Sequence, residues 1–184
     1  MTQILQVATQ AVDDKSIKVP SWVKVPSGAP AAVRNAIKSA EQAASVENYV
    51  KDQDLTAHVA RYAADLAAGK RVVVLAHSQG NFYANSAYER LSSKSGFGIV
   101  AVGTPASFTA GDGPYTTLTN DQIITPIPGR RAPNTTNGSA FVNATASTDG
   151  HSFTGNYLNG DVSGPQIVAQ VKARIASLSC PVTP

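Results

Sequence analysis

One short run of residues constrains the fold of this chain more than any other. Residues 71–76 read Arg-Val-Val-Val-Leu-Ala, a continuous apolar and β-branched stretch that is typical of a strand buried on both faces. The chain then passes through His77, Ser78, Gln79 and Gly80 into a segment whose apolar residues have helical spacing. A buried strand that turns directly into a helix is a building unit of parallel sheets. The sequence therefore predicts an α/β fold.

Other segments fit the same class. Apolar residues spaced by three and four predict helices over 54–68 and 165–178, and the apolar run 97–102 predicts a second buried strand. Residues 115–119 and 140–143 are weaker strand candidates. Because strands alternate with helices, we expect a short, mostly parallel sheet with helices on both faces.

Residues 1–53 form a region of a different kind. Helical patterns over 2–12 and 31–44 flank an apolar stretch, 19–25, that prolines interrupt. This helical and Pro-broken region also carries Trp22. We expect it to act as a cap over a site on the rest of the chain.

Composition sets the broad limits. With 184 residues and 42% hydrophobic content, the chain is predicted to be a single domain, 1–184, whose core is 54–184. A net charge of +3 with scattered Lys and Arg argues against nucleic-acid binding. No apolar run is long enough for an integral membrane helix, and no signal-peptide pattern is visible. A single cysteine excludes an internal disulfide and a cysteine-rich metal site.

Ser78 occupies the turn between the buried strand and the helix. A serine on a tight, strained turn of this kind projects its hydroxyl above the carboxyl edge of the sheet, where it can act as a nucleophile. Ala76 and Gly80 supply small side chains where the two backbones are expected to pass close together. The amide N–H of Gln79 would begin the helix and stabilise a developing oxyanion. The alternative is a buried strand that merely precedes a Ser-Gln-Gly turn.

Three histidines could serve such a nucleophile as general base: His58, His77 and His151. His77 is next to the serine in sequence, but a sharp turn aims neighbouring side chains apart, so we interpret it as a packing residue. His58 lies on the predicted helix before the turn. In enzymes built on this turn the chain order is serine, acid, histidine, which selects His151. A structural loop histidine is the alternative interpretation.

The acid that orients the histidine must then lie between Ser78 and His151. Candidates are Glu89, Asp112, Asp121 and Asp149. We prefer Asp121, because it follows a strand candidate and would emerge at the carboxyl edge of the sheet. Asp149 remains the main alternative, although it would have to fold back on its own loop.

Together these segments resemble the lipase and esterase branch of the α/β-hydrolases. The resemblance lies in residues 71–81, Gly103-Thr104-Pro105, residues 120–128 and Gly150-His151, and it covers about residues 54–178. It implies a reduced α/β-hydrolase fold and a Ser78–Asp121–His151 triad. It also implies hydrolysis of small-molecule or lipid esters through an acyl-enzyme, without a cofactor or a metal.

One part of the family pattern is missing before Ser78. Family members carry an earlier strand whose His-Gly or Asn-Gly loop gives a second oxyanion donor, and no such segment is visible here. We therefore expect residues 72–75 to form a sheet edge, which is a pairing hazard. Residues 19–25 would cover the edge, or the chain would self-associate through it, unless this is an N-terminally truncated form of a hydrolase. A catalytically impaired binding or structural module stays an alternative to an enzyme.

Overall fold

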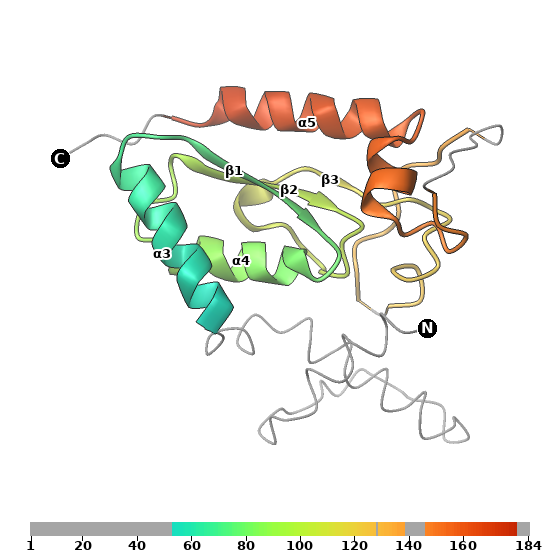
Figure 1. Ribbon diagram of the computed structural model, residues 1–184, viewed down its shortest axis with the longest axis horizontal. Helices are drawn as coiled ribbons and strands as arrows, with labels where there is room; N and C mark the ends of the chain where they lie inside the picture. The colour runs from blue at the N-terminus through green and yellow to red at the C-terminus, as the bar shows by residue number, and fades with distance from the viewer. Residues whose placement is uncertain (1–52, 128, 139–145, 180–184) are drawn as a thin grey trace, which may run out of the picture.

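The computed structural model describes residues 53–127, 129–138 and 146–179 of the chain, and Figure 1 shows their arrangement. The elements follow one another in the order α3 (Gln53–Ala67), β1 (Val72–His77), α4 (Gly80–Arg90), β2 (Phe97–Val102), η2 (Ala110–Asp112), β3 (Tyr115–Thr116), η3 (Phe153–Leu158) and α5 (Ser163–Ser177). The helices predicted over 2–12 and 31–44, the stretch 19–25, the cap and the strand candidate 140–143 lie outside the described residues.

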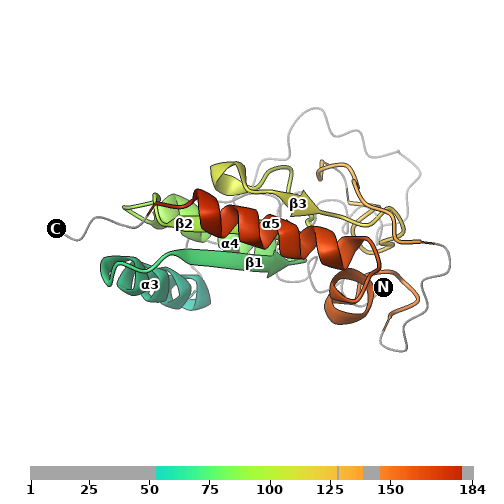
Figure 2. The same ribbon diagram turned by 90° about the horizontal axis from the view of Figure 1, so that it is seen from above.

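The three strands form one parallel sheet in the order β1-β2-β3. The register of the longer pair runs from Val72 opposite Phe97 to His77 opposite Val102. Helix α5 lies along one face of the sheet, while α3 and α4 lie on the other (Figures 1 and 2). The predicted α/β class, with a parallel sheet and helices on both faces, is confirmed for these residues. No helix among them is long and apolar enough to cross a membrane.

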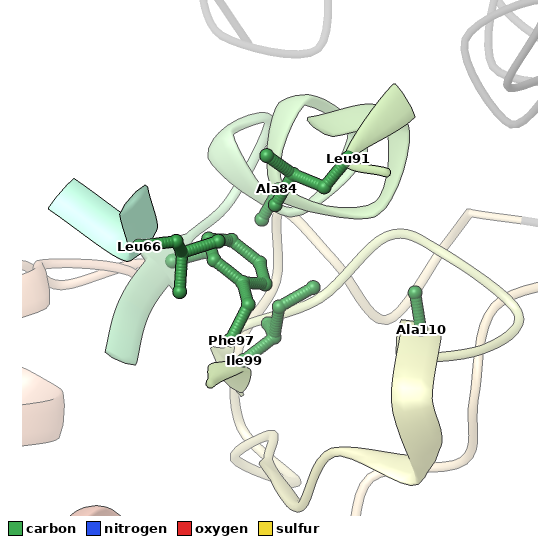
Figure 3. Packing of buried hydrophobic residues seen from close by; sticks show 7 residues of the cluster. Leu66, Ala84, Leu91, Phe97, Ile99 and Ala110 are labelled. Carbon is green, nitrogen blue, oxygen red and sulfur yellow. The ribbon is translucent and has the colours of Figure 1, made fainter. Parts of the chain in front are cut away.

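Central strand β2 anchors the core, because all six of its residues are buried. Phe97 and Ile99 pack against Leu66 of α3, against Ala84 of α4 and against Leu91, which follows α4 (Figure 3). On the α5 side, a second cluster joins Val102, Leu118, Tyr157 and Ile167. Burial on both faces explains why this strand reads as an uninterrupted apolar run.

Strand β3 is shorter than the predicted 115–119, because the Leu118 N–H, which lies on the side of β2, donates to the Tyr157 hydroxyl at 3.2 Å and not to the strand. On the opposite side of β3, the backbone binds the Asn134 side chain. The N–H of Thr117 donates to the side-chain oxygen of Asn134 at 2.9 Å, and the Asn134 amide donates back to the carbonyl of Tyr115 at 2.9 Å. Beyond this point only an isolated bridge pairs Leu118 with Thr135. The chain thus leaves the sheet early and delivers the residues that follow to its carboxyl edge.

Candidate active site

Ser78 sits on the turn between β1 and α4 in a strained backbone conformation. Its φ of 54° lies in the left-handed region that non-glycine residues seldom adopt. The Ser78 N–H donates to the carbonyl of Val102 in β2 at 3.1 Å. The buried amide of Asn81 donates to the carbonyls of Ser78 (2.8 Å) and Val102 (3.1 Å). These bonds fasten the turn to the neighbouring strand and hold the serine in place.

The two small residues beside the turn play different parts. Ala76 is buried, with 5% of its surface exposed, as a close approach of helix and strand requires. The prediction of a close approach at Gly80 is wrong. Among the described residues, a Cβ on Gly80 would meet no atom within 4 Å, and the φ of Gly80 is not positive. The left-handed conformation of Ser78 makes the sharp turn, so Gly80 starts α4 without crowding.

We expect the backbone strain at Ser78 to lower the stability of the protein by a measurable amount. The free energy of unfolding of Ser78→Gly should be about 1 kcal/mol higher than that of Ser78→Ala, because a Cβ in the left-handed region costs about that much. Both variants lack the hydroxyl, so the comparison isolates the backbone. Urea unfolding of the two proteins measures the difference. An alanine variant as stable as the glycine variant would contradict the strain.

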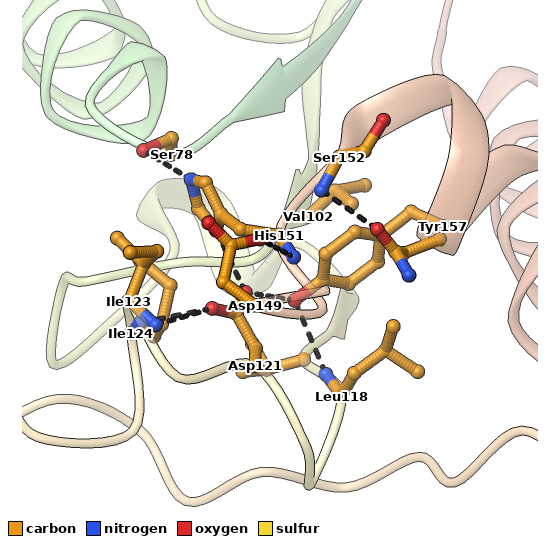
Figure 4. A network of polar contacts seen from close by, with 12 residues as sticks. Ser78, Val102, Leu118, Asp121, Ile123, Ile124, Asp149, His151, Ser152 and Tyr157 are labelled. Carbon is orange, nitrogen blue, oxygen red and sulfur yellow. Dashed lines mark hydrogen bonds and ion pairs between the residues drawn. The ribbon is translucent and has the colours of Figure 1, made fainter. Parts of the chain in front are cut away.

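The three predicted catalytic side chains meet in space, although they are far apart in sequence. Figure 4 shows them in one chain of hydrogen bonds. Ser78 Oγ lies 3.0 Å from His151 Nε2, and His151 Nδ1 lies 2.8 Å from Asp121 Oδ2. His151 is 4% exposed and Asp121 is fully buried. Ser78 comes from the β1–α4 turn, Asp121 from the loop after β3, and His151 from the loop before η3.

Asp121 is held by four donors. Its Oδ1 accepts the backbone N–H groups of Ile123 and Ile124, both at 3.0 Å. Its Oδ2 accepts the Tyr157 hydroxyl at 2.6 Å and the His151 ring N–H at 2.8 Å. A buried carboxylate with every oxygen engaged is fixed in orientation. It can therefore fix one tautomer of His151, in which Nε2 faces Ser78 as an acceptor.

The alternative acid, Asp149, shapes the loop instead. Its Oδ1 accepts the Ser147 hydroxyl at 2.5 Å and the backbone N–H of His151 at 3.0 Å. The Ser147 hydrogen bond, together with the His151 N–H, lowers the pKa of Asp149 below its usual value. Gly150, with φ 75°, lets this loop pass against the carbonyl oxygen of Asn120, where a Cβ would collide. The loop thus brings His151 beside Asp121.

The remaining candidates from the sequence lie away from this cluster. Nδ1 of His58 is 3.1 Å from the Tyr62 hydroxyl on the exposed side of α3. The Glu89 carboxylate lies 3.6 Å from Lys94 Nζ. Asp112 belongs to the short helix η2. None of the three contacts Ser78 or His151.

His77 packs against the rings of His151 and Phe153, which agrees with its interpretation as a packing residue. Its ring centroid is 4.7 Å from that of His151 and 5.0 Å from that of Phe153. Burial, reinforced by the neighbouring His151, lowers the pKa of His77 to about 4. His77 is therefore neutral at physiological pH, so it adds no positive charge beside His151.

Tyr157 was missed by the sequence analysis. It is fully buried, and its hydroxyl both donates to Asp121 and accepts the Leu118 N–H at 3.2 Å. Burial and the nearby Asp121 raise the pKa of Tyr157 far above its usual value, so its hydroxyl remains a donor. An aromatic residue spaced 36 positions from its carboxylate partner leaves no local signal in the sequence.

We expect Tyr157→Phe to lower the free energy of unfolding by about 2 kcal/mol, because it leaves a buried carboxylate with one donor fewer. Tyr115→Phe is the matched control: its hydroxyl donates to the Ala132 carbonyl at an exposed position, and the loss should stay below about 1 kcal/mol. Chemical denaturation of both variants tests the difference. Equal losses would show that the Tyr157 hydroxyl does not support Asp121.

Gln79 directly follows Ser78 and is the N-cap residue of α4, so its amide lies at the positive end of that helix. No group of three or more His, Cys, Asp or Glu side chains in the described ranges is arranged to hold a metal ion. The arrangement can therefore move a proton from a serine hydroxyl to a histidine that a buried carboxylate orients. Comparisons with family models, with curated proteins and with solved structures find no match to this chain.

Proposed function

We propose that this protein is a serine hydrolase that cleaves carboxylic esters through an acyl-enzyme intermediate. The single observation that carries the proposal is the continuous chain of hydrogen bonds from Ser78 Oγ through His151 to Asp121, at 3.0 and 2.8 Å. The strained conformation of Ser78 supports the proposal, because strain of this kind is concentrated at functional sites. The fold class is compatible with a reduced α/β-hydrolase.

In the first half of the reaction, Ser78 Oγ attacks the ester carbonyl carbon and its proton passes to His151 Nε2. Asp121 stays ionised and stabilises the resulting imidazolium. The backbone N–H of Gln79 stabilises the negative oxygen of the tetrahedral intermediate. When this intermediate collapses, the bond to the alcohol oxygen breaks, and His151 returns its proton to the leaving alcohol.

In the second half, a water molecule attacks the acyl group on Ser78 and gives a proton to His151. Collapse of the second tetrahedral intermediate breaks the bond to Ser78 Oγ, which takes the proton back. The carboxylic acid leaves, and the enzyme returns to its starting state. Neutral His77 favours both halves, because a charged ring 4.7 Å from the His151 ring would oppose imidazolium formation.

A burst experiment tests the proposal. Mixed rapidly with a 4-nitrophenyl ester, the protein should release nitrophenol in a fast phase close to one equivalent, followed by slower turnover. The fast phase reports acylation of Ser78 and the slow phase reports its hydrolysis. Esters of several acyl lengths extend the assay to the substrate class. Release no faster than in buffer for every ester would contradict the proposal.

A further inference from the structure

The outer edge of β1 offers backbone groups that have no partner among the described residues. Val72 and Ser78 both donate their N–H groups toward β2, at 2.8 and 3.1 Å. Successive backbone groups of a strand point to opposite sides, so those of Val73 and Leu75 face the other way. The sheet order places β1 at the end of the sheet, and no described strand pairs with that side. An open edge of this kind is a template for one more strand.

An apolar groove runs beside the same edge. It has a volume of about 490 Å³ and is lined by side chains of β1 and α5 and by the residue before β1: Arg71, Val73, Leu75, Val171 and Ile175. Leu75 and Ile175 remain 37% and 41% exposed. A ligand that fills this groove and also supplies backbone donors and acceptors would satisfy both features. An extended apolar peptide has that chemistry.

We infer that residues 19–25 of the same chain occupy this edge as an added strand and cover the groove. The sequence there is Val-Pro-Ser-Trp-Val-Lys-Val, followed by Pro26. Proline has no N–H and is tolerated only where that position faces away from the sheet. Pro20 and Pro26 lie six positions apart, an even spacing, so one register turns both of them outward. The N–H groups of Ser21, Val23 and Val25 then all face β1.

The same register protects the new edge of the sheet. Pro20, Trp22, Lys24 and Pro26 would direct their backbone N–H positions to solvent, and two of these four positions have no donor to offer. Prolines and an edge lysine are the features with which natural sheets block further pairing. A strand with this pattern suits the edge position and no interior position.

Tethering favours this segment over a second copy of the chain. Residues 26–52 connect it to α3, and they reach about 60 Å even with 31–44 helical, whereas α5 is only about 22 Å long. A tethered segment acts at an effective concentration of the order of millimolar, far above that of a second protein molecule in dilute solution. The occupant therefore comes from the same chain.

Amide exchange of the full chain, followed by NMR, tests the inference with two proline variants. Val23→Pro removes a donor that faces β1, whereas Lys24→Pro changes a position that faces solvent. In the wild type and in Lys24→Pro, the Val73 and Leu75 amides should be protected. In Val23→Pro they should exchange at least about tenfold faster. The Val74 amide, which faces β2, should stay protected throughout and shows that the sheet remains folded.

Two results would overturn the inference. In the first, the Val73 and Leu75 amides of the wild type exchange as fast as those of a free peptide. In the second, their protection survives Val23→Pro and grows with protein concentration, which would identify a second copy as the occupant. Both results are independent of ester hydrolysis, so they leave the proposed function untouched.

Discussion

Replacing Asp121 by asparagine is expected to lower kcat for the proposed ester hydrolysis about 10⁴-fold, the loss that the same change causes in a known Ser-His-Asp triad. All four groups that face this carboxylate are donors: two backbone N–H groups, the Tyr157 hydroxyl and the His151 ring N–H. An asparagine must turn its own NH₂ toward some of them. Where it faces His151, the ring shifts its proton to Nε2, and the atom that should receive the Ser78 proton is no longer an acceptor.

Asp149→Asn is the matched control for this experiment. Asp149 is as close to His151 in sequence as any carboxylate, yet it contacts the backbone N–H and not the ring. Its replacement should leave kcat near the wild-type value. Steady-state kinetics of both variants separate the two carboxylates. A large loss in Asp149→Asn with a small loss in Asp121→Asn would reverse the assignment of the acid.

The second large effect is a loss of folding stability at low pH, which we expect His77 to cause. The pKa of His77 is about 4 in the folded protein, against 6.5 for the ordinary side chain. Between these two values the unfolded chain binds a proton that the folded protein does not, so stability falls as the pH falls from about 6.5 to about 4. The His77 contribution to this loss is about 3 kcal/mol, at 1.36 kcal/mol for each pKa unit.

His77→Phe should remove this part of the pH dependence while keeping an aromatic ring against His151 and Phe153. Urea unfolding of wild type and variant at a series of pH values from 8 to 4 measures how the free energy of unfolding depends on pH. The two curves should run close together above pH 7 and separate below, with the variant losing less stability. Parallel curves over the whole range would mean that His77 takes up its proton equally in the folded and unfolded states.

The elements nearest the site could be predicted because their signals are local. Strand β2 coincides with the predicted run 97–102, since burial on both faces leaves an uninterrupted apolar stretch. The strand, turn and helix around Ser78 could be predicted in the same way, from a local sequence pattern. Chain order then selected His151, and the preference for Asp121 over Asp149 agrees with the observed contact to the His151 ring.

The support around the site could not be predicted, because it depends on contacts between distant segments. Asn81 fastens the turn to β2, and Tyr157 reaches Asp121 from η3, but neither stands in a distinctive local pattern. Strand β3 ends early because the Leu118 N–H donates to the Tyr157 hydroxyl, which comes from a distant segment. The prediction that the turn needs a small residue at Gly80 is wrong, because the left-handed conformation of Ser78 makes the turn.

The mass of the protein after exposure to a fluorophosphonate probe shows directly whether Ser78 is an activated nucleophile. We expect one covalent adduct, located on the peptide that contains Ser78. The adduct should be absent from Ser78→Ala and strongly slowed in His151→Ala, because the histidine must take the serine proton. An intact, folded protein that gains no adduct, or gains one on a residue other than Ser78, would show that Ser78 is not the nucleophile.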